Sequence, residues 1–315
     1  MVPSPDASSA HSSGPPRCPL TGSYEVKLRY HTRDYGCTGE AFGVWESEIN
    51  GLCFTWPVPE ADEMARYYNM PAYLSHNSEQ RGLFAALYRR VRTHMHGRKL
   101  KLIRAYVKLR SAKVLDFGCG SGHFAAYLQA SRPGWQVAGV EPHAAAAAHA
   151  REAHQLSVYP ALSELPDGEH ERLSLITAWH ALEHVHDPRE TLLQMNQRLV
   201  HHGKLILALP NYLSYDAQVY GQHWAGLDTP RHLFHFSPAG ITKLAAACGF
   251  SLEEKQGMPF DAFYVSLLSE KYAGHGFTGP LRAGITALLS NIYAVSNVNR
   301  SSSVMYVFTK TSALS

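Results

Sequence analysis

Three glycines recur at alternate positions in the stretch Val114-Leu-Asp-Phe-Gly-Cys-Gly-Ser-Gly122, directly after a short apolar run. The apolar run is typical of a buried strand in a parallel sheet, and apolar residues at helical spacing follow from Phe124. Glycines let the backbone turn sharply and approach a ligand closely, while the N-terminus of a following helix presents unpaired N–H groups. This order of residue types predicts a nucleotide-type binding site, and the alternative is a tight turn without a ligand.

The spacing also indicates which ligand the loop binds. A dinucleotide fingerprint needs glycine where His123 stands, so an oxidoreductase is disfavoured. The D-x-G-x-G-x-G pattern resembles motif I of the class I S-adenosylmethionine-dependent methyltransferases, in which the loop wraps the methionine part of the cofactor. The resemblance implies that a carboxylate after the second strand accepts hydrogen bonds from the ribose diol, and Glu141 follows the strand-like run 137–140. The predicted cofactor-binding residues are Asp116, Phe117, Gly118, Cys119, Gly120, Gly122, Glu141, Pro142, Trp179 and His180.

A second group of reactive side chains lies in the segment Trp179-His-Ala-Leu-Glu-His-Val-His-Asp-Pro188, after the fourth expected strand. Ligands of open α/β sheets bind at the carboxyl ends of the strands, so this segment is expected to border the cofactor. We predict His184 as the general base, because a neutral imidazole can take a proton from an acceptor hydroxyl or amine. Two alternatives stay open. Glu183, His184 and His180 share one face of a helical turn and could hold a divalent cation, or the turn is purely structural.

The segment after the fifth expected strand is rich in aromatic, histidine and arginine side chains, and it contains the run Trp224-Ala-Gly-Leu-Asp-Thr-Pro-Arg-His-Leu-Phe-His-Phe236. Its place after the carboxyl end of a strand indicates an acceptor pocket. We predict that Arg231 and His232 act on the acceptor together with His184. The predicted wall of the pocket consists of Tyr220, Trp224, Phe260 and Tyr264. The alternative is that Arg231 pairs with Asp228 and that the aromatic residues belong to the core.

The elements that must position these residues alternate between strand-like and helix-like from residue 114 to 250, which is typical of a doubly wound α/β sheet. Expected strands cover 114–117, 137–140, 156–159, 173–178, 204–209 and 303–310, and expected helices include one from Pro188 to Gly203 and one from Thr242 to Cys248. We predict seven strands, mostly parallel. The predicted parts are a disordered tail (1–17), a small β-rich appendage (18–59), a helical cap (60–110) and a methyltransferase domain (111–315) with a helical insertion (258–300).

Over about residues 18–310 the chain resembles one bacterial group of class I methyltransferases, related to the ubiquinone-biosynthesis O-methyltransferases. The motifs that carry this resemblance are W-H-x-L-E-H, P-N-x-x-S, W-x-x-x-D-x-P-R-H-L-x-H-F and M-P-F-D-A-F-Y-V-S. The related E-x-x-E-H motif binds a metal, but His180 replaces its first glutamate, so a bound divalent metal is not favoured. The zinc ribbon of the group looks degenerate, because Cys18, Cys37 and Cys53, with His31, lack paired C-x-x-C knuckles.

Composition sets limits on the partners. The 315 residues carry a net charge of +3, which is too mild by itself to predict a polyanion partner. Basic side chains nevertheless line the polar face of the expected helices between residues 89 and 110. This face is either simply exposed to solvent or a surface that binds RNA. These side chains are Arg89, Arg90, Arg92, Arg98, Lys99, Lys101, Arg104, Lys108 and Arg110. Five irregularly spaced cysteines and the lack of a bilayer-length apolar run lead us to expect a cytoplasmic protein.

The function predicted from these features is transfer of a methyl group from S-adenosylmethionine to an oxygen or nitrogen nucleophile of a small-molecule acceptor, with S-adenosylhomocysteine as the product. One alternative is methylation of RNA or another polyanion bound to the basic 89–110 face. The other is a non-catalytic subunit that binds S-adenosylmethionine. The sequence does not indicate the acceptor or the oligomeric state.

Overall fold

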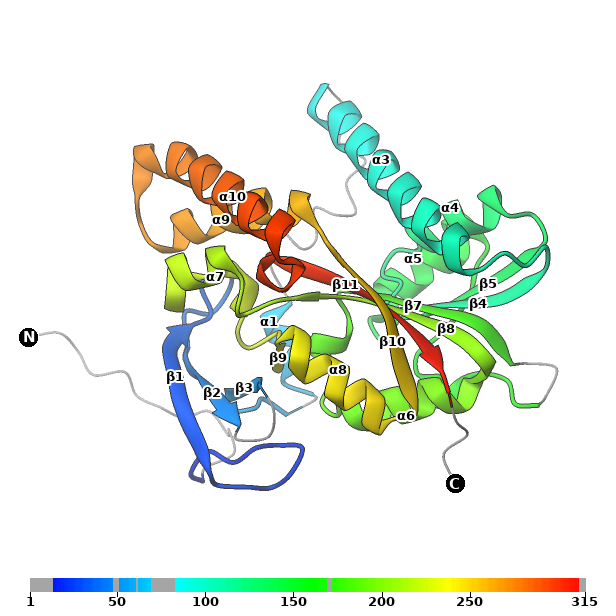
Figure 1. Ribbon diagram of the computed structural model, residues 1–315, viewed down its shortest axis with the longest axis horizontal. Helices are drawn as coiled ribbons and strands as arrows, with labels where there is room; N and C mark the ends of the chain where they lie inside the picture. The colour runs from blue at the N-terminus through cyan, green and yellow to red at the C-terminus, as the bar shows by residue number, and fades with distance from the viewer. Residues whose placement is uncertain (1–13, 48–50, 61, 69–82, 169–171, 312–315) are drawn as a thin grey trace, which may run out of the picture.

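The computed structural model of the protein describes residues 14–47, 51–60, 62–68, 83–168 and 172–311. Most of these residues form one large sheet with helices on both faces, and a smaller sheet lies beside it (Figure 1). Residues 1–13, which make up most of the predicted disordered tail, lie outside the described residues. No helix in the described part of the chain is long and apolar enough to cross a membrane.

The large sheet has the strand order β10-β11-β8-β7-β4-β5-β6. Its strands are β4 (Ala112–Phe117), β5 (Trp135–Val140), β6 (Ser157–Tyr159), β7 (Leu173–Trp179), β8 (Leu199–Pro210), β10 (Phe250–Gly257) and β11 (Ser303–Lys310). Strand β11 is antiparallel to both of its neighbours, whereas the other adjacent pairs run parallel. The predicted seven-stranded, mostly parallel sheet is therefore confirmed.

Helices cover this sheet on both faces because neighbouring strand residues point in opposite directions. On β4, Val114 packs in the core that contains α3 (Leu83–Tyr106), α4 (His123–Ser131) and α5 (Ala144–His154). Leu115 packs in the core of the other face, with α6 (Pro188–Arg198) and α8 (Pro238–Ala247). Figure 1 shows the two groups of helices on opposite sides of the sheet.

The small sheet has the order β1-β2-β3-β9 and combines distant parts of the chain. Its strands are β1 (Val26–Arg33), β2 (Ala41–Ser47), β3 (Leu52–Trp56) and β9 (Phe234–Phe236). The first three lie within the predicted β-rich appendage (18–59), but the three-residue β9 is too short for a sequence pattern to reveal. Phe236 pairs with Leu52 and Phe234 with Phe54, so the N-terminal strands are joined directly to the segment that follows β8.

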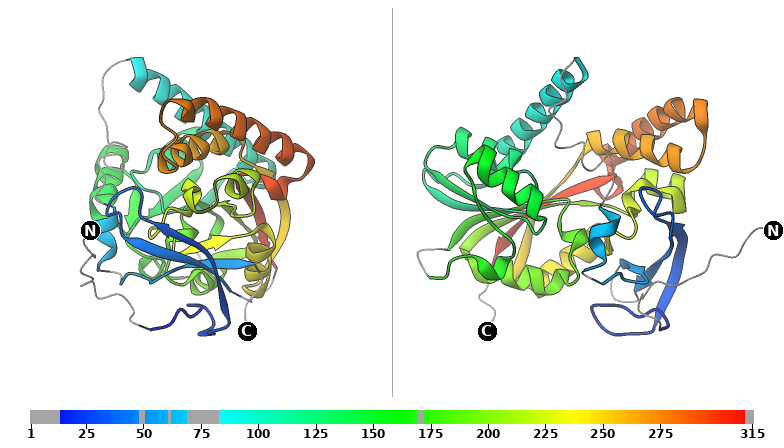
Figure 2. Two further views of the ribbon diagram at one scale, coloured as in Figure 1. Left: turned by 90° about the vertical axis from the view of Figure 1, so that its left-hand side faces the viewer. Right: turned by 180° about the vertical axis from the view of Figure 1, so that it is seen from behind.

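Further helices and turns complete the described part of the structure. They are α1 (Met64–Tyr67), α7 (Tyr215–Tyr220), α9 (Pro259–Tyr272) and α10 (Gly279–Ser296), with 3-10 turns η2 (Leu162–Glu164), η4 (Leu182–His184), η5 (Gly221–His223), η6 (Ala225–Leu227), η7 (Gly276–Thr278) and η8 (Val298–Arg300). Helices α9 and α10 form a hairpin in the expected insertion, on the same side of the sheet as α3 (Figure 2).

Two boundaries differ from the sequence-based expectation. The helix that begins at Pro188 ends at Arg198 instead of Gly203, because Leu199 is already extended and pairs with Leu173 as the start of β8. Strand β10 was not predicted. Its second half carries the polar run 253–256, which hides the alternation of apolar residues that would indicate a strand. A strand at the edge of a sheet tolerates such a run.

Candidate active site

The glycine loop connects β4 to α4 at the carboxyl end of the sheet. Gly118, Gly120 and Gly122 all have positive φ, at 70°, 54° and 79°, which is the region that favours glycine. A Cβ at Gly122 would lie 2.8 Å from the Cβ of Ala150, so α4 and α5 need this glycine to approach each other. A Cβ at Gly120 would meet nothing within 4 Å. The middle of the loop therefore faces open space, as a cofactor-binding loop must.

Glu141 fixes this loop against the end of β5. Its Oε2 accepts a hydrogen bond from the backbone N of Gly120 at 2.8 Å, and its Oε1 accepts one from the backbone N of His143 at 2.9 Å. A carboxylate has further lone pairs beyond these two bonds, so it can also accept hydrogen bonds from a diol. The geometry of Glu141 thus fits the role that the sequence predicted.

Of the other predicted residues near the loop, Asp116 and Cys119 are buried beneath it. Asp116 is buried and accepts a 2.7 Å hydrogen bond from the hydroxyl of Thr177, and burial raises the pKa of its carboxyl to about 6. Cys119 is buried against Gly139 of β5. Phe117 is half-buried, and Pro142 is exposed beyond Glu141.

Lys99 of α3 lies at this site, although the sequence-based interpretation placed it on a solvated helix face. Its Nζ is 4.1 Å from the ring centroid of Trp179 and 5.0 Å from that of Phe124. Burial lowers the pKa of the Lys99 ammonium to about 8, against the opposing effect of Asp116 and Asp261. No hydrogen bond or ion pair to Lys99 occurs within the described part of the chain. A half-buried cation against Trp179 and Phe124, the second residue of α4, suits the carboxylate of the methionine part of a cofactor.

The spacing of Lys99 could have revealed its position. It precedes the buried Ile103 by four residues, so the two share the inner face of α3, and the buried Val107 follows directly after the helix. The exposed basic face of α3 includes Arg98, Lys101 and Arg104.

The turn after β7 begins at His180, which has a positive φ of 53°. Its Nε2 lies 3.2 Å from Oδ2 of Asp261 on α9, and its Nδ1 lies 3.4 Å from Oε1 of Glu183. Burial alone would lower the pKa of His180, but the carboxylates of Asp261 and Glu183 raise it to about 10. His180 is therefore a cation at neutral pH that connects the end of β7 to α9, and both ring nitrogens face protein carboxylates instead of a cofactor.

Glu183, His184 and His232 form a compact cluster next to this turn. One possible ligand atom from each of the three lies within 4.8 Å of the others, and the two imidazole rings are 4.7 Å apart. Glu183 is 1% exposed, and neither carboxylate oxygen has a hydrogen-bond partner among the described residues. Cationic His180 lies 3.4 Å from Oε1, so Oε2 is the carboxylate oxygen that has no polar partner among the described residues and can bind a group from outside the chain.

The backbone orients both imidazoles of the cluster. Nδ1 of His184 lies 3.0 Å from the carbonyl oxygen of Arg231, and Nδ1 of His232 lies 3.0 Å from that of Gly226. A carbonyl oxygen only accepts hydrogen bonds, so both Nδ1 atoms donate to the backbone and the Nε2 atom of each ring is the one left for a ligand. The hydroxyl of Tyr68 also lies 3.0 Å from Nδ1 of His184.

Two imidazoles and a carboxylate make a donor set for a divalent transition-metal ion. Burial and the neighbouring His232 lower the pKa of His184 to about 4. A group with this pKa is neutral at pH 7 but a weak base, so the position favours a ligand role for His184 over the predicted general-base role. The sequence-based interpretation included Glu183 and His184 in a possible cation site but did not assign His232 to it.

Arg231 has a structural position, so its predicted catalytic role is wrong. It is 1% exposed, and its guanidinium binds the carboxylates of Asp228 at 2.7 Å and Asp34 at 3.0 Å. Its Nη1 donates to the backbone oxygen of Tyr67 at 2.9 Å. All three guanidinium nitrogens bind protein groups, and the 1% exposure of Arg231 keeps an acceptor molecule away from it.

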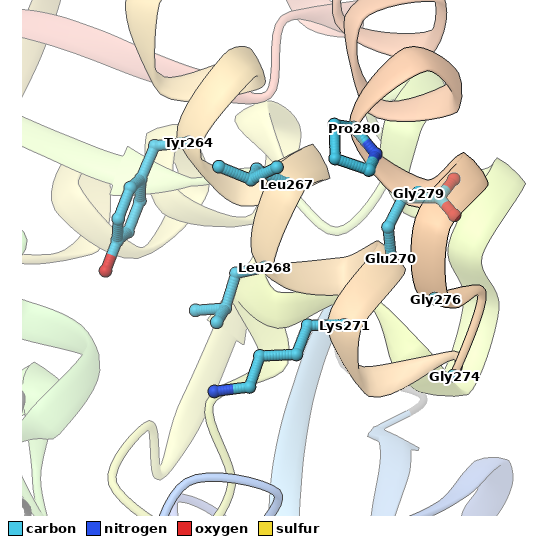
Figure 3. A pocket seen from close by; sticks show the side chains of 9 residues that line it. All are labelled: Tyr264, Leu267, Leu268, Glu270, Lys271, Gly274, Gly276, Gly279 and Pro280. Carbon is cyan, nitrogen blue, oxygen red and sulfur yellow. The ribbon is translucent and has the colours of Figure 1, made fainter.

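The four residues of the predicted acceptor wall do not come together. Tyr220 and Trp224 are buried, and they donate hydrogen bonds to Glu270 and Asp216 respectively. Tyr264 is 68% exposed on α9, at the edge of a cavity of about 530 Å³ on the α9–α10 hairpin (Figure 3). Phe260 is 47% exposed, and its ring lies 5.5 Å from the guanidinium carbon of Arg98.

The N-terminal cysteines do not assemble a metal site within the described residues. Cys18 and Cys53 are buried and Cys37 is exposed, and neither of the two three-ligand clusters found in the described chain contains a cysteine. The Sγ of Cys37 instead lies 3.4 Å from the backbone oxygen of Arg66.

Comparison with known proteins identifies the family. A family model described as a methyltransferase domain matches residues 88–255, which is more than half of the chain. The chain belongs to this family. It is an S-adenosylmethionine-dependent methyltransferase with the class I fold. The comparison with curated proteins finds no match.

Solved structures align with this chain at low sequence identity. Magnesium protoporphyrin IX methyltransferase from Synechocystis PCC 6803, with bound S-adenosylhomocysteine, aligns with a TM-score of 0.52 and 13% identity over 80% of this methyltransferase and 100% of that chain. YcgJ from Bacillus subtilis aligns with a TM-score of 0.46 and 18% identity over 70% and 99%. Coclaurine N-methyltransferase, bound to N-methylheliamine and S-adenosylhomocysteine, aligns with a TM-score of 0.46 and 13% identity over 68% and 72%.

Proposed function

We propose that the protein methylates a hydroxyl group of a small-molecule acceptor, with a divalent cation held by Glu183, His184 and His232. The observation that carries this proposal is the buried Oε2 of Glu183, which has no polar partner among the described residues and lies in a compact cluster with the imidazoles of His184 and His232. The cluster adjoins the cofactor loop, because a Cβ at Gly118 would lie 2.6 Å from the Cβ of Ala181 in the same turn.

The cofactor side of the proposal rests on three contacts. The open position at Gly120 accommodates the cofactor, Glu141 accepts the ribose hydroxyls, and Lys99 pairs with the methionyl carboxylate. Nε1 of Trp179 is buried without a hydrogen-bond partner among the described residues, so it has a free donor for the same ligand. S-adenosylmethionine supplies a methyl group that its sulfonium already activates. The protein then has to align donor and acceptor and exclude water.

The cation cluster favours an oxygen nucleophile over nitrogen. A divalent cation, when bound, lowers the pKa of a coordinated hydroxyl and orients it. An uncharged amine needs no such activation. The low pKa of His184 also leaves the cluster without a strong protein base for a hydroxyl. An O-methyltransferase of the ubiquinone-biosynthesis type, which the sequence motifs resemble, is consistent with these arguments.

The two alternative functions have less support. An RNA methyltransferase would use the basic face of α3, but Lys99 turns away from that face toward Trp179. A subunit that binds the cofactor without catalysis would not need free metal-ligating atoms beside the loop. A cytoplasmic location stays a prediction.

Calorimetric titration with S-adenosylhomocysteine tests the cofactor site first. We expect micromolar binding by the wild type and loss of binding in Gly120→Val and Glu141→Ala, because the first fills the open space and the second removes the diol acceptor. Folding of each variant is checked by circular dichroism. No binding by the folded wild type would refute the assignment of this site.

Turnover of hydroxylated small molecules with radiolabelled methyl donor tests the acceptor and the cation. After chelation, we expect activity to return with Mn²⁺, Mg²⁺ or Zn²⁺ in the wild type but not in Glu183→Gln, which still binds S-adenosylhomocysteine. Methylation that survives chelation and Glu183→Gln would remove the cation from the mechanism. Methylation of amines alone would exclude the hydroxyl acceptor.

A further inference from the structure

A second cluster of histidines lies at the other end of the cofactor loop, away from Glu183. His123 is the first residue of α4, and His149 and His154 belong to α5. Nδ1 of His123 and Nε2 of His154 are 3.1 Å apart. The ring of His149 has its centroid 6.0 Å from that of His123 and 5.8 Å from that of His154, and one nitrogen of each ring lies within 4.8 Å of the others.

Backbone packing holds these three rings together. The close contact between Gly122 and Ala150 brings the N-terminus of α4 against the last turns of α5, and His149 directly precedes Ala150. The first turn of α5 is also fixed, because the backbone N of His143 donates to Glu141. The cluster therefore has a defined geometry and does not depend on long, mobile side chains.

The environment keeps two of the imidazoles neutral. Burial, Arg92 and the other two histidines lower the pKa of His123 to about 4, and burial, His149 and Arg92 also lower the pKa of His154. Neutral imidazoles are the form that binds metal ions. The only hydrogen-bond contact within the cluster joins His123 and His154. His149 makes no hydrogen bond within the described part of the chain.

We propose that His123, His149 and His154 bind a Zn²⁺ ion that links α4 to α5. Three imidazole nitrogens match the preference of Zn²⁺, with a fourth position left for water. The neighbouring charge of Arg92 works against a cation. Because the three rings are only half-buried, solvent screens that repulsion. This site is separate from the Glu183 cluster and does not depend on the proposed acceptor.

Zinc titration of the chelator-treated full-length protein tests the proposal. The background is Glu183→Gln, so that the Glu183 cluster does not contribute. We expect one equivalent of Zn²⁺ to bind and to raise the melting temperature. His149→Ala should weaken binding at least tenfold, because alanine preserves α5 and removes one ligand. His201→Ala, a change at another histidine outside both clusters, should leave binding unchanged.

Two results would overturn the proposal. One is zinc affinity in the His149→Ala protein equal to that of its background. The other is absence of any zinc binding in the Glu183→Gln background, when circular dichroism shows that protein to be folded. A His154→Ala variant is the second test, because loss of either ligand must weaken zinc binding. Zinc affinity that falls in His149→Ala but not in His154→Ala would also contradict the three-histidine site.

Discussion

Two charges of opposite sign lie at the site without a hydrogen-bond partner among the described residues, and they have strong functional implications for single residues. Lys99 is half-buried against Phe124 and Trp179, and Glu183 is fully buried with His180 3.4 Å from its Oε1. Burial of a charge is unfavourable unless it is compensated. Compensation for Lys99 is therefore expected from an anionic ligand, whereas His180 compensates Glu183 at Oε1 and leaves Oε2 for a bound cation.

Replacing Lys99 tests this idea for the cofactor. Lys99→Met keeps most of the side-chain volume but removes the charge. We expect the affinity for S-adenosylhomocysteine to fall about 10- to 100-fold, because a hydrogen bond to a charged group contributes about 1.5–3 kcal/mol. Calorimetry measures the change, and Lys101→Met, at an exposed position of the same helix, is the matched control. Equal affinity in Lys99→Met and wild type would show that Lys99 does not contact the cofactor.

A single residue also provides a test of acid stability. Burial lowers the pKa of His96 to about 4, and Lys99 and Arg92 act in the same direction. Between pH 6.5 and 4 the unfolded chain takes up a proton at this residue that the folded protein does not, so His96 makes the free energy of unfolding fall as the pH falls. His96→Phe keeps a ring against Phe124 and should reduce this fall by up to about 1.4 kcal/mol per pH unit. Urea titrations at pH 7, 6 and 5 compare the slopes, and identical slopes would contradict the pKa shift.

At the scale of elements, the glycine loop combines two requirements. Gly120 leaves space for a ligand, whereas Gly122 allows α4 to meet α5. Changes at these two positions should therefore separate binding from stability.

Gly122→Ala tests the packing role. Its Cβ would lie 2.8 Å from Ala150 and 2.9 Å from Leu156, in addition to the cost of the positive φ. We expect the free energy of unfolding to fall by about 2–4 kcal/mol, as measured by urea denaturation. Gly39→Ala is the control, because Gly39 has a φ of 75° and no atom within 4 Å of an added Cβ. If both variants lose the same stability, close packing at Gly122 contributes nothing.

Elements defined by local patterns were predictable from the sequence, and those defined by distant partners were not. The loop, Glu141 and most strands of the large sheet follow from short runs of apolar residues and glycine. Strand β9 has only three residues and exists because it pairs with β3, about 180 residues earlier in the chain. Arg231 was misassigned for the same reason, since its partner Asp34 is equally distant in sequence.

At the scale of the whole molecule, Arg231 connects three separate parts of the chain. It binds Asp34 after β1, the backbone of Tyr67 in α1, and Asp228 in the segment before β9. Its two carboxylate partners surround one buried guanidinium. The network is therefore a joint between the small sheet and the methyltransferase domain.

Arg231→Met should destabilise this joint strongly. Removing the guanidinium leaves Asp34 buried without its cation, which costs about 3–5 kcal/mol for a buried pair. The free energy of unfolding from urea titration should fall by this amount, whereas Arg29→Met, which breaks a partly exposed pair with Glu46, should cost about 1 kcal/mol or less. A loss of similar size in both variants would mean that Arg231 does not hold the two sheets together.

The pairing of β3 with β9 also bears on how the protein is made. At about 5–20 residues per second, a ribosome needs roughly 10–35 s to add the 180 or so residues between these strands. Until then the edge of β3, with Leu52 and Phe54, has no neighbour to cover it. The nascent chain thus carries an open apolar strand edge through most of the synthesis of the cofactor-binding half. A chain that stops before Phe236 keeps that edge, and it should aggregate or be captured by a chaperone.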